Sequence, residues 1–183
     1  MRPWNFSFPS TNFFSLIHTN RPDHTNAKDH SSLLPNLQSR NELQYAPHTT
    51  LIIAPMSIIG QWQSEAEESA KEGTMKIQLY YGAGKALNLQ AQCCGHNAAS
   101  APDIVITSYG VILSEWQQFM QNNGNYTDVT GIFGIEFFRV VIDEGHNIKN
   151  RLSKTAKACY QIKASRRWVL TGECPYTCET DIY

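Results

Sequence analysis

The sequence lacks several features that would identify a class of protein directly. No stretch holds 18 consecutive apolar residues, the length that a membrane-spanning helix needs, so we expect no membrane span. Residues 1–17 contain no continuous apolar core, which argues against a secretory signal peptide and predicts an intracellular protein. The net charge of −1 is too small to indicate a class of partner.

The five cysteines do not form a disulfide pattern. Cys93 and Cys94 are adjacent and cannot easily bridge each other. Cys174 and Cys178 have no second ligand pair at the spacing of a zinc site. The pattern therefore favours reduced thiols in a cytosolic or nuclear protein, and the alternative is a metal site built by Cys93, Cys94 and His96.

Glycine does not occur before Gly60, and the phosphate-binding pattern Gly-x-x-x-x-Gly-Lys-Ser/Thr occurs nowhere. That loop surrounds nucleotide phosphates with backbone amides and supplies a lysine to them. Residues 82–85 read GAGK, but Leu79 stands where the first glycine is required and Ala86 where Ser or Thr is required. We therefore do not expect residues 82–85 to bind phosphate.

The composition changes near residue 48. Residues 1–48 hold five of the eight prolines and four of the six histidines, which predicts a polar, poorly ordered segment. Residues 49–183 alternate short apolar runs with amphipathic stretches, as strands and helices do. A chain of 183 residues with 42% hydrophobic content is long enough for one domain with a sizeable core.

The alternation indicates an α/β fold with a parallel sheet between helices. In the first predicted helix, Ile59, Trp62 and Ala66 share one face, Ser57 is the expected N-cap and Gly73 the expected end. Strands are predicted at 51–54, 76–81, 103–107, 138–142 and 167–171, and further helices at 109–121 and 153–162.

Polar residues follow three of these strands at their carboxyl ends, where open α/β sheets bind ligands. Ser57 follows the first strand, Asp143 and Glu144 follow the fourth, and Thr171 and Gly172 the fifth. Paired carboxylates suit a nucleotide-bound magnesium ion, because one can hold the ion or its waters while the other orients an attacking water. An acidic pair also caps helices or faces solvent, so the pair alone is a weak signal.

The residues around the pair resemble the motifs of Swi/Snf-type DNA-dependent ATPases of helicase superfamily two. Residues 140–150 (VVIDEGHNIKN) resemble the Walker B box, in which glycine replaces a commoner alanine at position 145. Residues 50–62 (TLIIAPMSIIGQW) resemble motif Ia, 103–111 (DIVITSYGV) the motif Ib region, and 168–172 (WVLTG) the start of motif III. All four occur in the family's order and spacing.

Finer details are most similar to one branch of that family, which contains the fungal post-replication-repair translocase and ubiquitin ligase and the helicase-like transcription factor. They include APMS at 54–57, YYG at 80–82 and FFRVVIDE at 137–144. Residues 14–21 (FSLIHTNR) resemble the tail of the helix that follows Walker A, so residues 13–21 would be that tail and 22–48 a variable insertion.

The resemblance implies a RecA-like first lobe of the P-loop NTPase type over residues 49–183, incomplete at its N-terminal strand and phosphate loop. It implies ATP with magnesium at Asp143 and Glu144, a catalytic role for these two and His146, and nucleotide contacts by Thr171 and Gly172. It also implies a nuclear protein that moves on double-stranded DNA during repair, with ubiquitin-pathway partners of the parent protein. The expected DNA contacts are Ser57, Ser108, Lys149, Arg151, Lys154 and Lys157, the last four within a run of seven basic and no acidic residues from 149 to 167.

Two departures from the family pattern limit the expected activity. The Walker A loop is missing, and Glu173-Cys174 stands where the family has a threonine before proline. No second lobe with its arginine finger is recognisable, so we expect the chain alone to be inactive as an ATP hydrolase. One alternative is a non-catalytic remnant that binds the DNA backbone or a partner, and another is an unrelated α/β nucleotide or metal enzyme.

Overall fold

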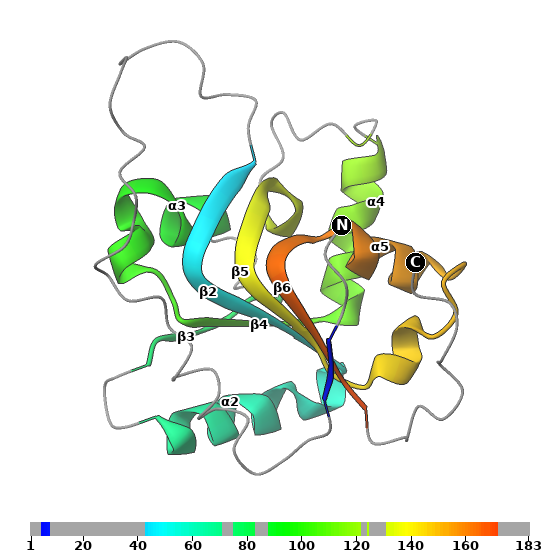
Figure 1. Cartoon of the computed structure of the whole chain (residues 1–183), viewed down its shortest axis with the longest axis horizontal. Coiled ribbons are helices and arrows are strands. Elements are labelled where there is room, and N and C mark those ends of the chain that lie inside the picture. The colour runs from blue at the N-terminus through cyan, green and yellow to red at the C-terminus, as the bar shows by residue number, and fades with distance from the viewer. Residues whose placement is uncertain are drawn as a thin grey trace.

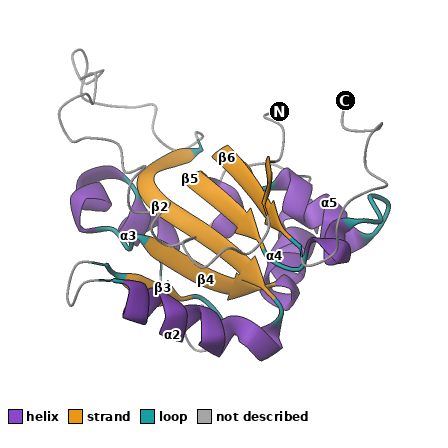
Figure 2. Ribbon diagram, turned by 60° about the horizontal axis from the view of Figure 1, so that its bottom comes forward, coloured by secondary structure: helices purple, strands orange, loops and turns teal. Residues whose placement is uncertain are grey.

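A computed structural model describes residues 5–7, 43–70, 75–82, 88–121, 124 and 131–171, with the backbone alone at 5–7. Within these residues the fold is α/β, as predicted, with parallel strands in the order β1-β6-β5-β2-β4-β3 (Figures 1 and 2). The strands are β1 Asn5–Ser7, β2 Gln44–Ala54, β3 Ile77–Leu79, β4 Ile104–Ser108, β5 Ile135–Ile142 and β6 Lys163–Leu170. The helices are α2 Ile59–Ser69, α3 Leu89–Cys93, α4 Tyr109–Gln121 and α5 Lys154–Gln161, with 3-10 turns η1 Met56–Ile58, η3 Gly95–Ser100, η4 Ile132–Gly134 and η5 Gly145–Ile148.

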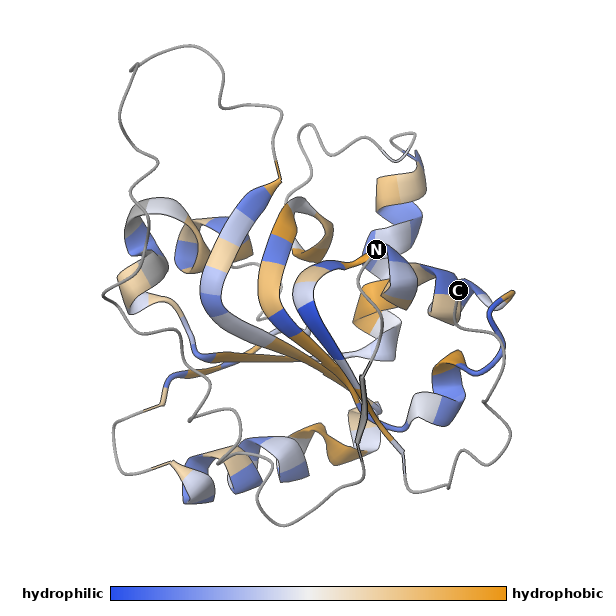
Figure 3. Ribbon diagram, viewed as in Figure 1, coloured by the Kyte–Doolittle hydropathy of each residue, from blue (hydrophilic) through white to orange (hydrophobic). Residues whose placement is uncertain are grey.

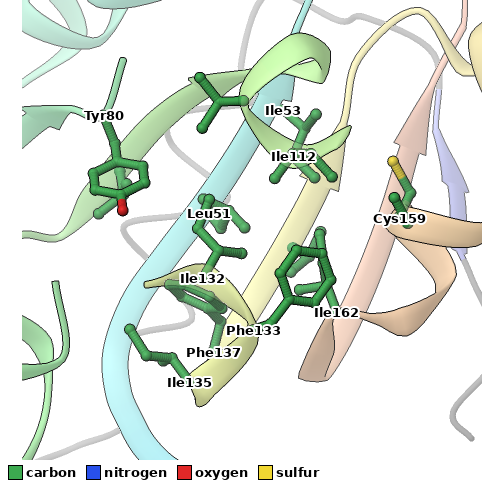
Figure 4. Packing of buried hydrophobic residues seen from close by; sticks show 14 of the residues in the cluster. Leu51, Ile53, Tyr80, Ile112, Ile132, Phe133, Ile135, Phe137, Cys159 and Ile162 are labelled. Carbon is green, nitrogen blue, oxygen red and sulfur yellow. The ribbon is translucent and has the colours of Figure 1, made fainter. Parts of the chain in front are cut away.

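The core lies on both faces of the sheet. Hydrophobic residues are concentrated where the central strands converge (Figure 3). On one face a large cluster joins the strands to α3, α4 and α5; Leu51, Phe133 and Phe137 lie at its centre (Figure 4). On the other face α2 packs Ile59, Trp62 and Ala66 against a smaller cluster. A parallel sheet needs such cover on both faces, which explains the continuous apolar runs in its central strands.

The sheet begins earlier in the chain than the sequence pattern predicts. Residues 44–48 were expected in the poorly ordered segment, but they form the first part of β2. Ala46 is fully buried and pairs with Phe137, and the register shifts between Ala46 and Thr50. Pro47 lies within this shift, where a missing backbone N–H costs least. Pairing with β5 therefore recruits residues whose local sequence is polar.

Strand β1 was also not predicted. Its residues Asn5–Ser7 pair in parallel with Trp168–Leu170 of β6. The predicted helix tail at 13–21 and the rest of residues 8–42 lie outside the described residues. None of the helices in the described part of the chain is long and apolar enough to cross a membrane.

Several element boundaries correct the sequence-based expectation. Ser57 is not the N-cap of the first helix, because the turn η1 intervenes and Ile58 occupies the cap of α2 without a side-chain hydrogen bond. Helix α2 ends at Ser69, before Gly73. Helix α4 spans residues 109–121 as predicted, and Ser153 Oγ caps α5 by accepting a hydrogen bond from Ala156 N.

Candidate functional site

The candidate site lies where parallel strands end at one edge of the sheet. Asp143 directly follows β5, which lies between β2 and β6, and its backbone N donates to Ile53 O at 2.9 Å. Ser108 is the last residue of β4, and Thr171 follows β6. Because parallel strands all end at the same edge, the structure brings these predicted residues to one side of the sheet.

The Asp143 carboxylate is held by two donors. Trp62 Nε1 donates to Asp143 Oδ2 at 2.6 Å, and Glu144 N donates to Asp143 Oδ1 at 2.8 Å. The Tyr109 hydroxyl donates to the Asp143 carbonyl oxygen at 2.5 Å. Helices α2 and α4 therefore both contribute a hydrogen bond to the residue that follows β5, and the carboxylate has one fixed orientation.

Burial raises the pKa of Asp143 above its ordinary value. The hydrogen bonds from Trp62 and Glu144 N lower it in part, and the nearby charges of Glu144 and Glu65 raise it. A cation beside Asp143 would offset the cost of burying this charge. Asp143 and Glu144 offer hard oxygen ligands, and magnesium typically uses one or two carboxylates together with waters and phosphates. The two carboxylates therefore fit a magnesium ion, whereas the described residues include no phosphate-binding loop.

Glu144 has an unusual backbone. Its φ of 52° lies in the left-handed region. Among the described residues, Glu144 is the only non-glycine residue with a positive φ. Its carbonyl oxygen accepts hydrogen bonds from Asn147 N and Nδ2, both at 3.0 Å. Glu144 Oε2 lies 3.1 Å from His146 Nδ1, and both side chains are about half exposed. Strain of this kind costs about 1–3 kcal/mol and often accompanies function.

Gly145 allows the backbone to approach β6 closely. A Cβ atom at this position would lie 2.3 Å from Val169 Cγ1. Real Cβ atoms do not approach other atoms so closely, so a side chain here would force Val169 or the turn to move. Glycine at position 145 therefore has a packing reason in this chain.

The predicted DNA contacts separate into two groups. Ser57 is exposed, but Ser108 is only 3% exposed, and its Oγ accepts a hydrogen bond from Val111 N at the start of α4. The structure therefore assigns the Ser108 hydroxyl to helix capping. The basic candidates are all exposed and lie either between η5 and α5 or on α5: Lys149, Arg151, Lys154 and Lys157. Of the predicted nucleotide contacts, Thr171 is half-buried and Gly172 lies outside the described residues.

Trp62 and Tyr109 are site residues that the sequence pattern did not reveal. The pattern predicts Trp62 on a buried helical stripe and Tyr109 at the start of a helix, and both lie there. Their polar atoms were the available signal, because buried Trp N–H and Tyr O–H groups usually find a hydrogen-bond partner. The sequence does not say which partner.

The alternative metal site at Cys93, Cys94 and His96 gains no support. Burial raises the pKa of Cys93 to about 11 and that of Cys94 to about 12, whereas a metal ligand must be a thiolate. The His96 side chain lies outside the described residues. No group of three or more His, Cys, Asp or Glu side chains suited to a metal occurs among the residues that the structure describes.

Comparison with known proteins gives consistent matches. A model of the SNF2-related domain matches residues 15–175. The chain is 52% identical to the DNA repair protein RAD5 of Gibberella zeae over 166 residues, or 86% of this chain and 14% of that protein. It is 46% identical to the DNA repair protein rad8 of Schizosaccharomyces pombe over 134 residues, or 73% of this chain and 11% of that protein. The chain therefore spans roughly a seventh or less of the length of these relatives.

A solved structure supports the fold. The SWI2/SNF2 ATPase core of Sulfolobus solfataricus, determined in complex with double-stranded DNA, matches 69% of this chain and 22% of that chain. The TM-score is 0.51 and the sequence identity is 24%, so the likeness shows the shared architecture of the sheet and its helices.

Proposed function

This chain belongs to the SNF2-related domain family, and on that premise we propose that it forms part of the first ATPase lobe of a RAD5-like DNA repair protein. In this role the chain contributes a magnesium-binding carboxylate pair and a basic surface for the DNA backbone. The single observation that carries the proposal is the Asp143 carboxylate, fixed by Trp62 at the carboxyl end of a central parallel strand.

The roles of the acidic residues follow from their positions. ATP would supply the phosphoanhydride bond, and magnesium would supply the positive charge that polarises this bond. Asp143, held by two hydrogen bonds, would keep one orientation toward the ion or its waters. Glu144 is half exposed beside it and could orient a water, with His146 at 3.1 Å to position the Glu144 carboxylate. Thr171 and Gly172 would complete the nucleotide contacts at the end of β6.

Manganese binding tests this assignment without requiring turnover. We expect the chain to bind Mn²⁺ weakly, detected by electron paramagnetic resonance, and Asp143→Asn to abolish that binding. Asp103→Asn is the matched control, because Asp103 lies at the amino end of β4, where Oδ2 accepts a hydrogen bond from Lys76 N. If Asp143→Asn and Asp103→Asn bind Mn²⁺ equally well, the carboxylate pair is not the metal site.

The exposed basic residues support the DNA part of the proposal. Lys154 and Lys157 lie one turn apart on α5. No acidic residue occurs between residues 149 and 167. Contacts of lysine with phosphate carry no base information, so binding should be weak, independent of sequence and strongly dependent on salt.

A salt titration of duplex binding tests this surface. We expect the slope of log affinity against log salt to fall by about 1–2 when Lys154 and Lys157 are both changed to Gln. Lys76→Gln is the control, because Lys76 is exposed just before β3, at the opposite edge of the sheet. A double variant with the wild-type slope would show that these lysines only solubilise α5.

A second candidate function is that of a non-catalytic remnant that binds the DNA backbone. It is favoured by the absence of a Gly-x-x-x-x-Gly-Lys-Ser/Thr pattern together with the exposed basic residues between Lys149 and Lys157. Salt-dependent duplex binding without Mn²⁺ binding would support this second function over the first. Nuclear localisation and contact with ubiquitin-pathway proteins are proposed only for the parent protein.

A further inference from the structure

Arg139 is a buried cation in the middle of the sheet. It lies on β5, its side chain is 2% exposed, and it is among the largest fully buried side chains of the described residues. Removing a guanidinium from water is costly unless an opposite charge and hydrogen bonds replace the lost hydration. A buried arginine therefore normally has a carboxylate beside it.

No such partner is found for Arg139 within the described part of the chain. Its Nε atom is buried without a hydrogen-bond acceptor. The interaction that the structure shows is with an apolar group, because Arg139 Cζ lies 5.3 Å from the centre of the Phe138 ring. A cation–π contact of this kind compensates only part of the lost hydration.

A second guanidinium shares the same ring. Arg166 on β6 is the register partner of Arg139, and its Cζ lies 4.4 Å from the centre of the Phe138 ring. Arg166 is exposed, so the pair extends from the interior to the surface. Burial, together with the charge of Arg166, lowers the pKa of Arg139 to about 10. The two cations therefore destabilise each other.

An acidic residue of the same strand, Glu136, acts on a different arginine. The charge of Glu136 raises the pKa of Arg167, opposing the lowering by burial. Arg167 Nη2 also donates a hydrogen bond to the Ile162 carbonyl oxygen. Arg139 and Arg166 consequently remain two neighbouring positive charges without a carboxylate from the described residues.

We propose that Arg139 and Arg166 together bind a doubly charged oxyanion of the phosphate class, with the Phe138 ring as the apolar floor of the site. One dianion neutralises both cations, whereas a single carboxylate would leave one charge uncompensated. The N–H groups of a guanidinium match the oxygens of such an anion in spacing and direction. The apolar ring lowers the local dielectric constant and strengthens both interactions.

This site is separate from the proposed nucleotide site and does not depend on it. Arg139 precedes Asp143 by four residues in an extended strand, which places their backbones about 13 Å apart. The oxyanion could be free phosphate or a phosphoryl group of the DNA backbone, since both present the same chemistry to arginine.

Nuclear magnetic resonance of the arginine Nε–H groups tests the proposal on the whole 183-residue chain. Sodium phosphate replaces sodium chloride at constant ionic strength, and the Arg139 signal is assigned by its loss in Arg139→Lys. We expect a saturable shift of that signal and an affinity about tenfold weaker in Arg166→Gln, which removes one charge-assisted contact. Because Arg166 is exposed, Arg166→Gln should fold even if Arg139→Lys does not. If Arg139→Lys does not fold, the Arg139 signal is assigned in the wild-type chain by through-bond correlation to its backbone.

Lys76→Gln is the control, since it removes an exposed charge just before the edge strand β3 and should leave the phosphate affinity unchanged. Two further titrations use sodium acetate and a short DNA duplex. A shift with duplex as well as phosphate identifies the DNA backbone as the source, and a shift with phosphate alone identifies the free anion. An unshifted Arg139 signal, an equal response to acetate, or an unchanged affinity in Arg166→Gln would each overturn the proposal.

Discussion

Trp62 Nε1 donates a hydrogen bond to Asp143 Oδ2 at 2.6 Å, although 81 residues separate them in the sequence. This bond connects α2 to the carboxyl end of β5. It ties the helix that follows the exposed Ser57 to the acidic residue of the proposed magnesium site. A substitution that alters α2 is therefore expected to affect Asp143, and a substitution at Asp143 is expected to affect α2.

We expect Trp62→Phe to lower the free energy of unfolding by about 2 kcal/mol, because the half-buried Asp143 carboxylate loses a charge-assisted donor. Urea unfolding at pH 7 measures this loss. Trp168→Phe is the matched control, because Trp168 Nε1 is buried without a hydrogen-bond partner among the described residues. If the two variants are destabilised equally, the effect comes from lost volume and the hydrogen bond contributes little. In an Asp143→Asn background the cost of Trp62→Phe should shrink.

Gly145→Ala should destabilise the chain by about 1–3 kcal/mol, since the new Cβ overlaps Val169 Cγ1. Thermal unfolding provides the measurement, and adding Val169→Ala should recover part of the loss from the overlap. Gly60→Ala is the control, because a Cβ on this exposed residue of α2 meets nothing within 4 Å and should stabilise the helix by about 0.5–1 kcal/mol. Equal stability of Gly145→Ala and the wild type would mean that the turn adjusts at no cost.

The isolated chain should show no DNA-stimulated ATP hydrolysis. It contains no Gly-x-x-x-x-Gly-Lys-Ser/Thr sequence, and the backbone amides and lysine of that loop supply the electrostatic stabilisation on which phosphoryl transfer depends. Phosphate release with and without duplex should therefore be the same for the wild type and for Glu144→Gln. Duplex-stimulated turnover that disappears in Glu144→Gln would refute the prediction and show that other residues hold the phosphates.

Stability should fall at alkaline pH because of buried thiols. Cys159 is fully buried, and burial raises its pKa from an ordinary value near 9 to about 12. Between these values the unfolded chain loses the thiol proton while the folded chain keeps it, so the unfolded state binds fewer protons and stability decreases as pH rises.

One such thiol accounts for a slope of up to about 1.4 kcal/mol per pH unit above pH 9. Urea unfolding between pH 7 and pH 10.5 should show a plateau followed by this decline. Cys159→Ala should be less stable at pH 7 but decline less steeply, while Cys93 and Cys94 continue to contribute. An identical decline in wild type and variant would assign the effect to other groups.

The sequence pattern was enough for the class of fold and for the position of the acidic pair. Apolar runs and helical periodicity report burial within a short segment, so α4 could be bounded at residues 109 and 121, and Asp143 could be placed directly after β5. These features depend on neighbours in the chain. The family motifs added the expected chemistry because they too are local strings of residues.

Long-range packing decided the rest. The burial of Trp62 could be read from its helical stripe, but its hydrogen bond to Asp143 required α2 and β5 to meet in space. The extension of β2 back to Gln44 required a pairing partner in β5 that overrides a polar local sequence. The burial of Arg139 runs against its own hydrophilicity, because the pairing of β5 with β2 and β6 places this residue in the middle of the sheet, where its side chain is 2% exposed. Periodicity in a sequence indicates which side chains are buried, whereas the identity of each partner depends on contacts between segments far apart in the chain.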